Sequence, residues 1–169
     1  MKILIAGCGK VGLTLAQRLS AENHDVTIVD TNDAALKRAS DSLDVMCLKG
    51  SATSVAVLTQ AQAGRSDVVI AATDSDEINM LCCHIVRRLG AGYTVARVRN
   101  AEYFSDVEGL KTELGINLVI NPEHAAAMEI ARLIRLPSAA NIDTFRQGRV
   151  ELVGFVTQEG DFLNGQSLS

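Results

Sequence analysis

The chain of 169 residues contains no tryptophan, only two prolines and only 4% aromatic residues. It has no basic excess, because 16 Lys and Arg stand against 20 Asp and Glu and give a net charge of −4. A main partner that is nucleic acid is therefore disfavoured. No uncharged apolar run approaches the roughly 20 residues of a membrane-spanning helix, and the N-terminus lacks a signal-peptide pattern. We expect any connection to a membrane to run through a partner.

Patterns typical of metal sites and disulfides are also missing. The four cysteines form no CxxC pair, which predicts reduced, mostly buried thiols; they are Cys8, Cys47, Cys82 and Cys83. The three histidines lie far apart without a second ligand at metal spacing, so we predict no metal site. What remains is an apolar fraction of 47%, rich in alanine and valine. This composition suits thin layers of helices packed on a parallel sheet.

Strand-like apolar runs alternate with helical patterns along the chain. The alternation predicts an α/β fold with a Rossmann-type, doubly wound parallel sheet. We expect a nucleotide-binding domain over 1–136 and the truncated beginning of a small α+β C-terminal lobe over 137–169. In that lobe, 142–146 and 150–156 are predicted strands joined by Gln147-Gly148. The strands expected in the first domain are 2–6, 26–30, 45–48, 68–71, 94–98 and 117–120.

Capping residues predict where several helices begin. One helix is expected to start after Thr31 or Asn32 and another after Asp74 or Ser75. A further helix, 122–135, follows Asn and Pro and carries apolar residues on more than one face. Two interpretations stay open for it: an ordinary buried helix, or a helix that also packs on a second copy of the chain.

The most informative motif is the glycine-rich turn directly after the first apolar run. Gly7 permits a tight turn, Gly9 lets a pyrophosphate approach the backbone, and Gly12 lets the next helix pack close to the strand. Val11 opens the apolar pattern of that helix, whose N-terminal N–H groups suit an anion. Lys10 stands inside the turn, and two interpretations stay open for it: a side chain that reaches a terminal phosphate, or one that is simply solvated. The motif predicts a nucleotide site.

Asp30 ends the second expected strand, where a carboxylate accepts hydrogen bonds from ribose hydroxyls. No arginine adjoins it, so NADP is the least expected ligand, whereas NAD, ATP and ADP stay open. A spacing of two is expected to place Arg97 and Arg99 on one face of a strand, where a guanidinium meets a phosphate. Further candidate ligand residues follow the third and fourth strands at the same edge of the sheet; they are Ser51, Thr73 and Asp74.

Two other classes of function share such a glycine turn. A short-chain NAD-dependent oxidoreductase needs a tyrosine and a lysine with three residues between them, but at that spacing Tyr93 is followed by Arg97 and Tyr103 by Val107. A redox-sensing repressor would add a pair of DNA-binding helices, for which we find no segment. We expect a nucleotide-binding module that is not an enzyme.

Longer segments resemble a known family. They are MKILIAGCGKVG at 1–12, VTIVDTN at 26–32, LKGSAT at 48–53, VIAATDSDEINM at 69–80, ARVRN at 96–100 and NPE at 121–123. Together they resemble the RCK or KTN domains, of the TrkA-N type, found in peripheral subunits of Trk potassium uptake systems. The resemblance covers essentially the whole chain.

The resemblance implies a cytoplasmic regulatory subunit, peripheral to the inner face of the cell membrane, that binds NAD or NADH and ATP or ADP. It implies gating of a Trk-type potassium-transporting membrane subunit and assembly into homodimers or rings. By position, Ser51 and Thr73 line the adenosine and Arg97 faces phosphates. Lys10 stands where relatives have an arginine that reaches a terminal phosphate in a neighbouring subunit. Glu123 matches an acid at a cation or phosphate contact between subunits.

Overall fold

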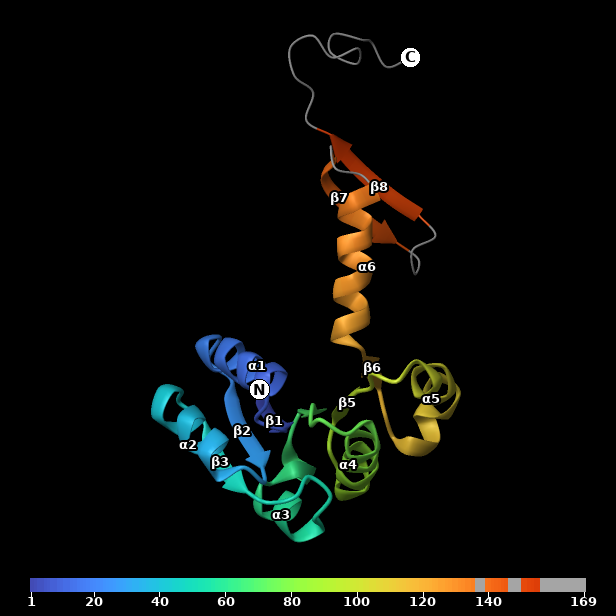
Figure 1. Ribbon diagram of the computed structural model, residues 1–169. Helices are drawn as coiled ribbons and strands as arrows, with labels where there is room; N and C mark the ends of the chain where they lie inside the picture. Colours follow the sequence, from blue (N-terminus) through green and yellow to red (C-terminus); the bar gives the residue numbers. More distant parts are fainter. Residues whose placement is uncertain (136–138, 146–149, 156–169) are drawn as a thin grey trace, which may run out of the picture. The chain divides into compact units, whose positions relative to one another are not determined.

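The computed structural model describes residues 1–135, 139–145 and 150–155, and the chain divides into two compact units after Glu123. The first unit contains a six-stranded sheet in the order β3-β2-β1-β4-β5-β6, with every neighbouring pair parallel (Figure 1). The predicted Rossmann-type fold is confirmed. The strands are β1 (Lys2–Ala6), β2 (Asp25–Asp30), β3 (Met46–Lys49), β4 (Val68–Ala71), β5 (Tyr93–Arg97) and β6 (Leu118–Ile120).

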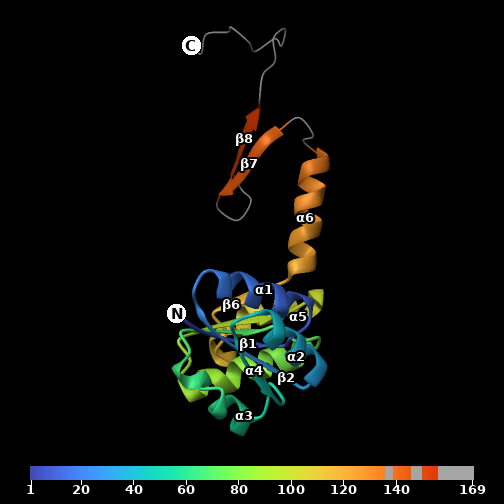
Figure 2. The ribbon, with the colours of Figure 1, turned by 90° about the vertical axis from the view of Figure 1, so that its left-hand side faces the viewer.

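Helices cover both faces of this sheet, as right-handed crossovers between parallel strands require. The first two helices share an apolar cluster with one face, and the next three share a cluster with the other, so that α1 and α3 lie on opposite sides of the sheet (Figure 2). The helices are α1 (Lys10–Ala21), α2 (Asp33–Ser42), α3 (Val55–Gln60), α4 (Asp76–Leu89) and α5 (Ala101–Leu114), with a short 3-10 turn, η1 (Ala63–Arg65), before β4.

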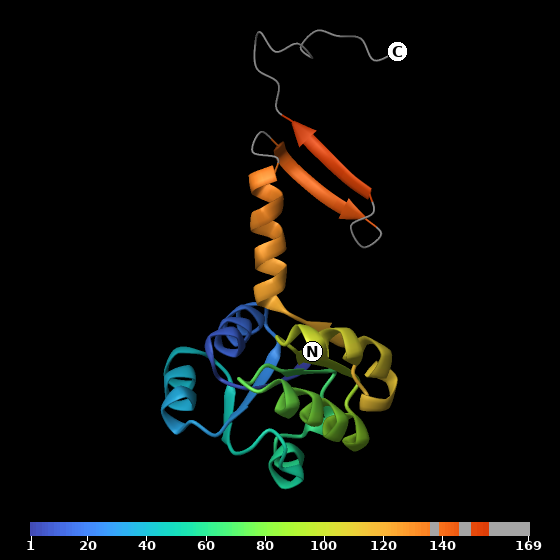
Figure 3. The same cartoon turned by 45° about the vertical axis from the view of Figure 1, so that its right-hand side comes forward.

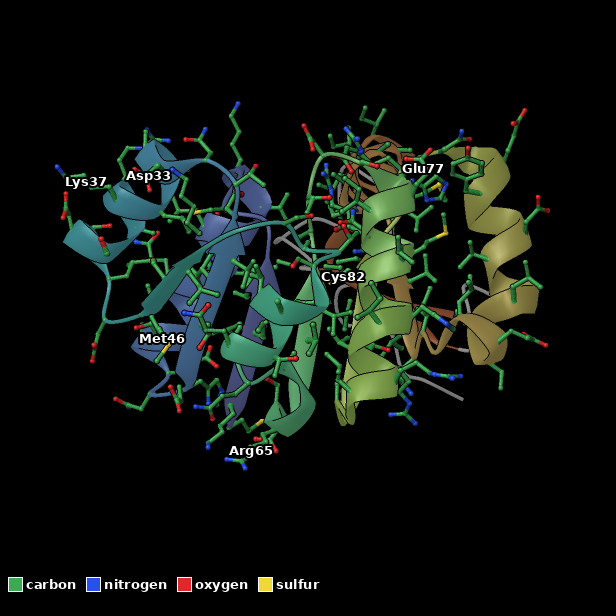
Figure 4. All side chains as sticks on the ribbon, turned by 90° about the horizontal axis from the view of Figure 1, so that it is seen from below. Asp33, Lys37, Met46, Arg65, Glu77 and Cys82 are labelled. Carbon is green, nitrogen blue, oxygen red and sulfur yellow. The ribbon has the colours of Figure 1, made fainter. Side chains whose placement is uncertain are left out.

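The strand order reverses between β1 and β4, and this reversal fixes where a ligand can bind. Because β1 leads to β2 on one side while β4 pairs on its other side, β1 and β4 form the switch point of the sheet, and ligands of open α/β sheets bind beyond the carboxyl ends of the strands at such a point. Asp33 and Glu77, in the first turns of α2 and α4, lie at this edge, whereas Arg65 lies at the opposite one (Figure 4).

Side-chain caps set the starts of the helices at this edge. The Asn32 side chain accepts a hydrogen bond from the backbone N–H of Ala35, and the Ser75 side chain accepts one from Ile78. Of the two candidates expected for each helix, the structure selects Asn32 and Ser75. Each cap satisfies an N–H group that has no partner inside its helix and so ends the preceding loop at a defined residue.

The central strands are buried on both faces. Two adjacent cysteines of α4 belong to the apolar cluster on one of these faces. Leu4, Ile28 and Val69 are fully buried, as are Cys82 and Cys83. Burial raises the pKa of the Cys82 thiol to about 12 and raises that of Cys83 as well. Since the thiolate is the reactive form, the raised pKa and the burial disfavour reaction of these cysteines in the folded protein.

The second unit begins inside the last helix. That helix, α6 (Pro122–Arg135), is followed by β7 (Ala139–Phe145) and β8 (Val150–Phe155), which pair antiparallel (Figure 3). The first predicted strand of this hairpin is therefore longer than 142–146, because it begins at Ala139. Gln147-Gly148 lies outside the described residues, and the domain boundary at residue 136 stays a prediction. No helix of the described residues is long and apolar enough to cross a membrane.

Burial of the thiols predicts their order of reaction. Cys47 is half-buried, whereas Cys8, Cys82 and Cys83 are buried. With a thiol-specific reagent we expect Cys47 to react first, and Cys82 and Cys83 to react only as fast as the sheet opens. Mass spectrometry of the labelled peptides measures this order. Fast labelling of the adjacent pair in the folded protein would contradict the packing of α4 described above.

Candidate functional site

Two glycines of the loop between β1 and α1 are required by the protein itself. Gly7 has a φ of +109°, and a Cβ at this position would lie 2.7 Å from the carbonyl oxygen of Ala72. A Cβ at Gly12 would lie 1.9 Å from the carbonyl oxygen of Gly7. The backbone N–H of Gly7 also donates to the carbonyl of Val29 at 2.8 Å. The turn is therefore wedged between the ends of β2 and β4, where only glycine fits.

Gly9 is different, because nothing in the packing of the described residues demands a glycine there. Its φ is −74°, and no atom lies within 4 Å of the place its Cβ would occupy. Gly9 is also the N-cap of α1 and supplies no side-chain cap. The first N–H groups of α1 therefore receive no side-chain cap, and uncapped N–H groups at a helix start suit an anion. Lys10, the first residue of the helix, is exposed, while Val11 packs against the core beneath it.

Asp30, the last residue of β2, holds this loop from the side. Its Oδ2 accepts a hydrogen bond from the backbone N–H of Cys8 at 2.5 Å, and its Oδ1 accepts one from Asn32 at 2.7 Å. The carboxylate is thus oriented before any ligand arrives. Each carboxylate oxygen has a second lone pair, so the group retains capacity for hydroxyl donors.

Ser51 lies in the loop after β3, next to the end of β2. The backbone N–H of Gly50 donates to the carbonyl of Asp30 at 2.8 Å, which fixes the start of this loop. The Ser51 hydroxyl lies 2.9 Å from that of Thr53 and accepts from the Thr53 N–H at 3.2 Å. Ser51 and Asp30 are therefore brought to the same stretch of the edge.

Asn79 organises the other half of the edge, and the sequence analysis gave it no role. Its side chain is fully buried, and its Oδ1 accepts from the backbone N–H of Thr73 at 2.8 Å and from the Thr73 hydroxyl at 2.7 Å. Its Nδ2 donates to the carbonyl of Arg97 at 2.9 Å and to that of Thr73 at 3.3 Å. One amide on α4 thus fastens the end of β4 to the end of β5.

The signal for Asn79 is present in the sequence. Asn79 shares helical spacing with Cys82, Cys83 and Val86, the residues by which α4 packs on the sheet. A polar residue at the first position of an apolar stripe is expected to be buried and hydrogen-bonded. The pattern therefore predicts that Asn79 is buried and hydrogen-bonded. The structure adds which backbone groups it binds.

Asp76 plays a similar part for the loop after β5. It is 6% exposed, and its Oδ2 accepts from the backbone N–H groups of Arg99 and Asn100, each at 2.8 Å. Asp74 differs from it, because its side chain is exposed while its carbonyl accepts a hydrogen bond from Nη2 of Arg99. The acidic segment therefore shapes the neighbouring loop through Asp76 and leaves Asp74 at the surface.

The two arginines do not share one strand face. Since β5 ends at Arg97, strand alternation does not extend to Arg99, and that expectation was wrong. Arg99 turns to the β4–α4 loop, with its Nε 3.6 Å from Oδ1 of Asp76. Arg97 is buried, with its side chain 11% exposed, and its Nη1 donates to the carbonyl of Thr73 at 3.4 Å.

Arg97 forms an ion pair with Glu123 through Nη2. Its Nε is shut off from solvent and has no hydrogen-bond partner among the described residues. Glu123 lies in the first turn of α6 and its side chain is 56% exposed. Partial desolvation raises the pKa of the Glu123 carboxyl, but a backbone hydrogen bond and Arg97 outweigh this effect, so the pKa lies below its ordinary value.

A family model described as the TrkA-N domain matches residues 3–122. The chain belongs to the TrkA-N family. A Trk system potassium uptake protein TrkA homolog from Archaeoglobus fulgidus is 37% identical over 169 residues, which make up 100% of this chain and 38% of that protein. This chain therefore spans about 38% of the length of that relative. The family expected from the sequence motifs is confirmed.

Solved TrkA-N and RCK structures share the fold. The TrkA-N domain of inner membrane protein ybaL from Escherichia coli has a TM-score of 0.69 at 19% identity, covering 79% of this chain and 96% of that one. The GsuK channel bound to NAD has a TM-score of 0.61 at 25% identity, covering 70% of this chain and 21% of that one. GsuK has also been solved bound to ADP.

This TrkA-N fold gathers most of the predicted ligand residues at one edge. The glycine loop, Asp30 and Ser51 form one side, and Thr73, Arg97 and Glu123 form the other. Asp74 stands at the rim with an exposed side chain. No group of three His, Cys, Asp or Glu side chains that could hold a metal ion occurs in the part of the chain that the structure describes.

Removing the Asn79 amide is expected to loosen this edge of the TrkA-N domain. In Asn79→Ala the N–H group of Thr73 and the carbonyl of Arg97 lose their hydrogen bonds to the buried amide, so we expect the free energy of unfolding to fall by about 3 kcal/mol. Leu81→Ala on the same helix is the control, because Leu81 is 48% exposed, and about 1 kcal/mol or less is expected there. Urea denaturation of both variants measures the difference. Equal losses would show that Asn79 is not a special fastening.

Proposed function

We propose that this chain binds adenine nucleotides, NAD or NADH and ATP or ADP, at the carboxyl edge of its sheet. We further propose that, as part of a longer protein, it uses the bound nucleotide to gate a Trk-type potassium-transporting membrane subunit. The observation that carries the proposal is the N-terminus of α1 at Gly9, which has no side-chain cap and where an added Cβ would meet no atom, in a loop whose Cys8 N–H is held by the carboxylate of Asp30. The names of the potassium uptake relatives and the GsuK structures with NAD and ADP support it.

The residues at the edge fit the parts of such a ligand. The backbone from Gly7 to Gly12 would hold the pyrophosphate, with the N–H groups of Lys10 and Val11 opening the helix toward it. Asp30, already oriented by two backbone donors, would accept from the ribose hydroxyls. A 2′-phosphate would meet this carboxylate at close range, so NADP is the ligand that the site disfavours.

The remaining predicted residues divide into an adenosine side and a phosphate side. Ser51 and the Thr73–Asp74 turn would line the adenosine. The Thr73 hydroxyl is engaged with Asn79 and Ser75, so Thr73 would contribute through its shape and backbone. Arg97 would face phosphates, because it is the buried cation of this edge.

The two tyrosines give no support for turnover. The hydroxyl of Tyr103 bonds to Glu77, whose negative charge, together with that bond, raises the pKa of Tyr103. A tyrosine that acts as a general acid or base near neutral pH needs its pKa shifted the other way. Tyr93 begins β5 and so lies at the edge away from the glycine loop. We therefore propose that the nucleotide is a signal and is not consumed.

A surface of α6 supports the proposed assembly into dimers or rings. Met128, Ile130, Leu133 and Ile134 are each more than half exposed. Exposed apolar side chains that gather on one helix are typical of an interaction site. A second copy of the chain is the partner that we propose for it, and the membrane would be reached through the transporter subunit on the cytoplasmic side.

Gating by a nucleotide requires different contacts in two states of the assembly, since equal affinity for both states shifts nothing. ATP differs from ADP by one phosphate, and NADH differs from NAD in the charge and shape of its nicotinamide. Contacts to the phosphates are therefore the proposed source of discrimination between ATP and ADP.

Gly9→Ala tests the site without disturbing the fold. An added Cβ at this φ meets no protein atom, so the free energy of unfolding is expected to stay within about 1 kcal/mol. The same Cβ enters the proposed pyrophosphate space, so we expect the Kd for ADP and NAD to rise at least about tenfold. Titration calorimetry of the ligand-free chain with ATP, ADP, NADH and NAD measures both the binding and the order of preference.

Gly109→Ala is the matched control. Gly109 lies within α5, and its Cβ would also meet nothing within 4 Å. We expect it to stabilise the chain by roughly 1 kcal/mol and to leave nucleotide affinity unchanged. If neither ADP nor NAD binds the unmodified chain, the proposed site is wrong. If both bind equally well to Gly9→Ala, they bind elsewhere.

A substitution of Lys10 tests whether its side chain contacts the terminal phosphate of ATP. Its side chain is exposed at the start of α1 and carries the charge closest in sequence to the glycine turn. In Lys10→Ala we expect the ratio of ADP to ATP dissociation constants to approach one while NAD affinity changes little. Competition titrations measure the ratio. A uniform loss for all three nucleotides would assign Lys10 to the shared pyrophosphate instead.

A further inference from the structure

The guanidinium of Arg97 is a buried cation whose hydrogen-bonding capacity is only partly used. A guanidinium has five N–H donors, and a buried charge is tolerated only when it is paired and hydrogen-bonded. The described contacts employ Nη1, toward the Thr73 carbonyl, and Nη2, toward Glu123. The Nε of the same side chain has no partner among the described residues.

The unused donor stands beside the used one. Nε and Nη2 form the side-on fork of an arginine, which matches two oxygens of one carboxylate or phosphate group. Glu123 engages this fork through one oxygen, Oε1, bound to Nη2. The ion pair therefore uses one of the two adjacent donors, Nη2, and leaves the other, Nε, without a partner among the described residues.

The counterion comes from a different element than the sheet. Arg97 ends β5, whereas Glu123 belongs to the first turn of α6, 26 residues further along the chain. Glu123 keeps 56% of its side chain exposed, so it can leave the guanidinium at little cost in solvation. Arg97 is fixed more firmly, because Asn79 holds its carbonyl and its side chain is 11% exposed.

We propose that Glu123 occupies the phosphate position of Arg97 in the nucleotide-free chain, and that a nucleotide phosphate takes its place and releases the first turn of α6. The inference rests on the proposed nucleotide site and deepens it. A phosphate offers two oxygens to Nε and Nη2 where Glu123 offers one, so it satisfies the donor that the ion pair leaves unused. Two anions repel each other at one guanidinium, so the exchange is competitive.

The exchange connects ligand charge to the helix that leaves the nucleotide unit. Residues of α6 beyond Glu123 belong to the second compact unit, so the state of Glu123 is passed on through a continuous helix. Coupling is reciprocal: whatever holds Glu123 away from Arg97 raises nucleotide affinity by the factor by which the nucleotide releases Glu123. Adenosine, which has no phosphate, would bind without releasing it.

Glu123→Gln in the whole chain tests the exchange, because it keeps the size of the side chain and removes its charge. We expect the Kd for ADP and for AMP to fall about tenfold, and the Kd for adenosine to stay unchanged. The matched control is Glu102→Gln, which removes an exposed carboxylate in the first turn of α5, at the same edge of the sheet. Both phosphate-containing ligands are expected to bind that control as they bind the unmodified chain.

Hydrogen exchange supplies a second readout that a general charge effect would not move. With ADP, amides of 124–127 are expected to exchange faster in the unmodified chain, and with adenosine they are not. In Glu123→Gln these amides should exchange fast from the start, with no further change on adding ADP.

The outcomes separate the two proposals. If ADP binds the unmodified chain and Glu123→Gln with equal affinity, the proposed exchange is wrong while the nucleotide site stands. The same holds if the Kd for ADP falls equally in Glu123→Gln and Glu102→Gln. If ADP binds neither the unmodified chain nor Glu123→Gln, the nucleotide site is wrong and the exchange falls with it.

Discussion

The buried amide of Asn79 is the interaction on which the candidate ligand edge depends. Parallel strands leave their last N–H and C=O groups unpaired where the sheet ends, and such groups are costly when they are buried. Beyond the ends of β4 and β5, the neutral side chain of Asn79 pairs with such groups: it donates two hydrogen bonds and accepts two. A neutral group does this without adding a charge to the edge.

Two carboxylates also hold the loops at this edge, and each accepts hydrogen bonds from backbone N–H groups. Asp30 binds the N–H groups of Cys8 and Asn32, and Asp76 binds those of Arg99 and Asn100. Because these carboxylates accept hydrogen bonds from backbone N–H groups, they fix the loops after β1, β2 and β5. The glycine loop then needs no side chain of its own to keep its shape, and Gly9 is left with open space.

Much of this arrangement was predictable from the sequence, and the exceptions have physical causes. The strands were predictable because parallel strands buried on both faces appear as short apolar runs between helices, and Asn32 and Ser75 marked two helix starts. Arg99 was misjudged because a spacing of two is informative only inside a strand, and β5 ends at Arg97. The helical spacing of Asn79 marks it as a buried polar residue, but its partner Arg97 lies 18 positions away, and no local pattern specifies that contact.

The same reasoning explains why Arg97 is the sensitive point of the edge. Backbone N–H groups at the start of α1 attract an anion through partial charges, and that attraction is shared by every ligand with a phosphate. Arg97 carries a full charge in a buried position and must always have a counterion. The chain supplies one from Glu123, on the helix that leads out of the first compact unit. A phosphate bound at this edge therefore cannot pair fully with Arg97 without changing the partner of that helix.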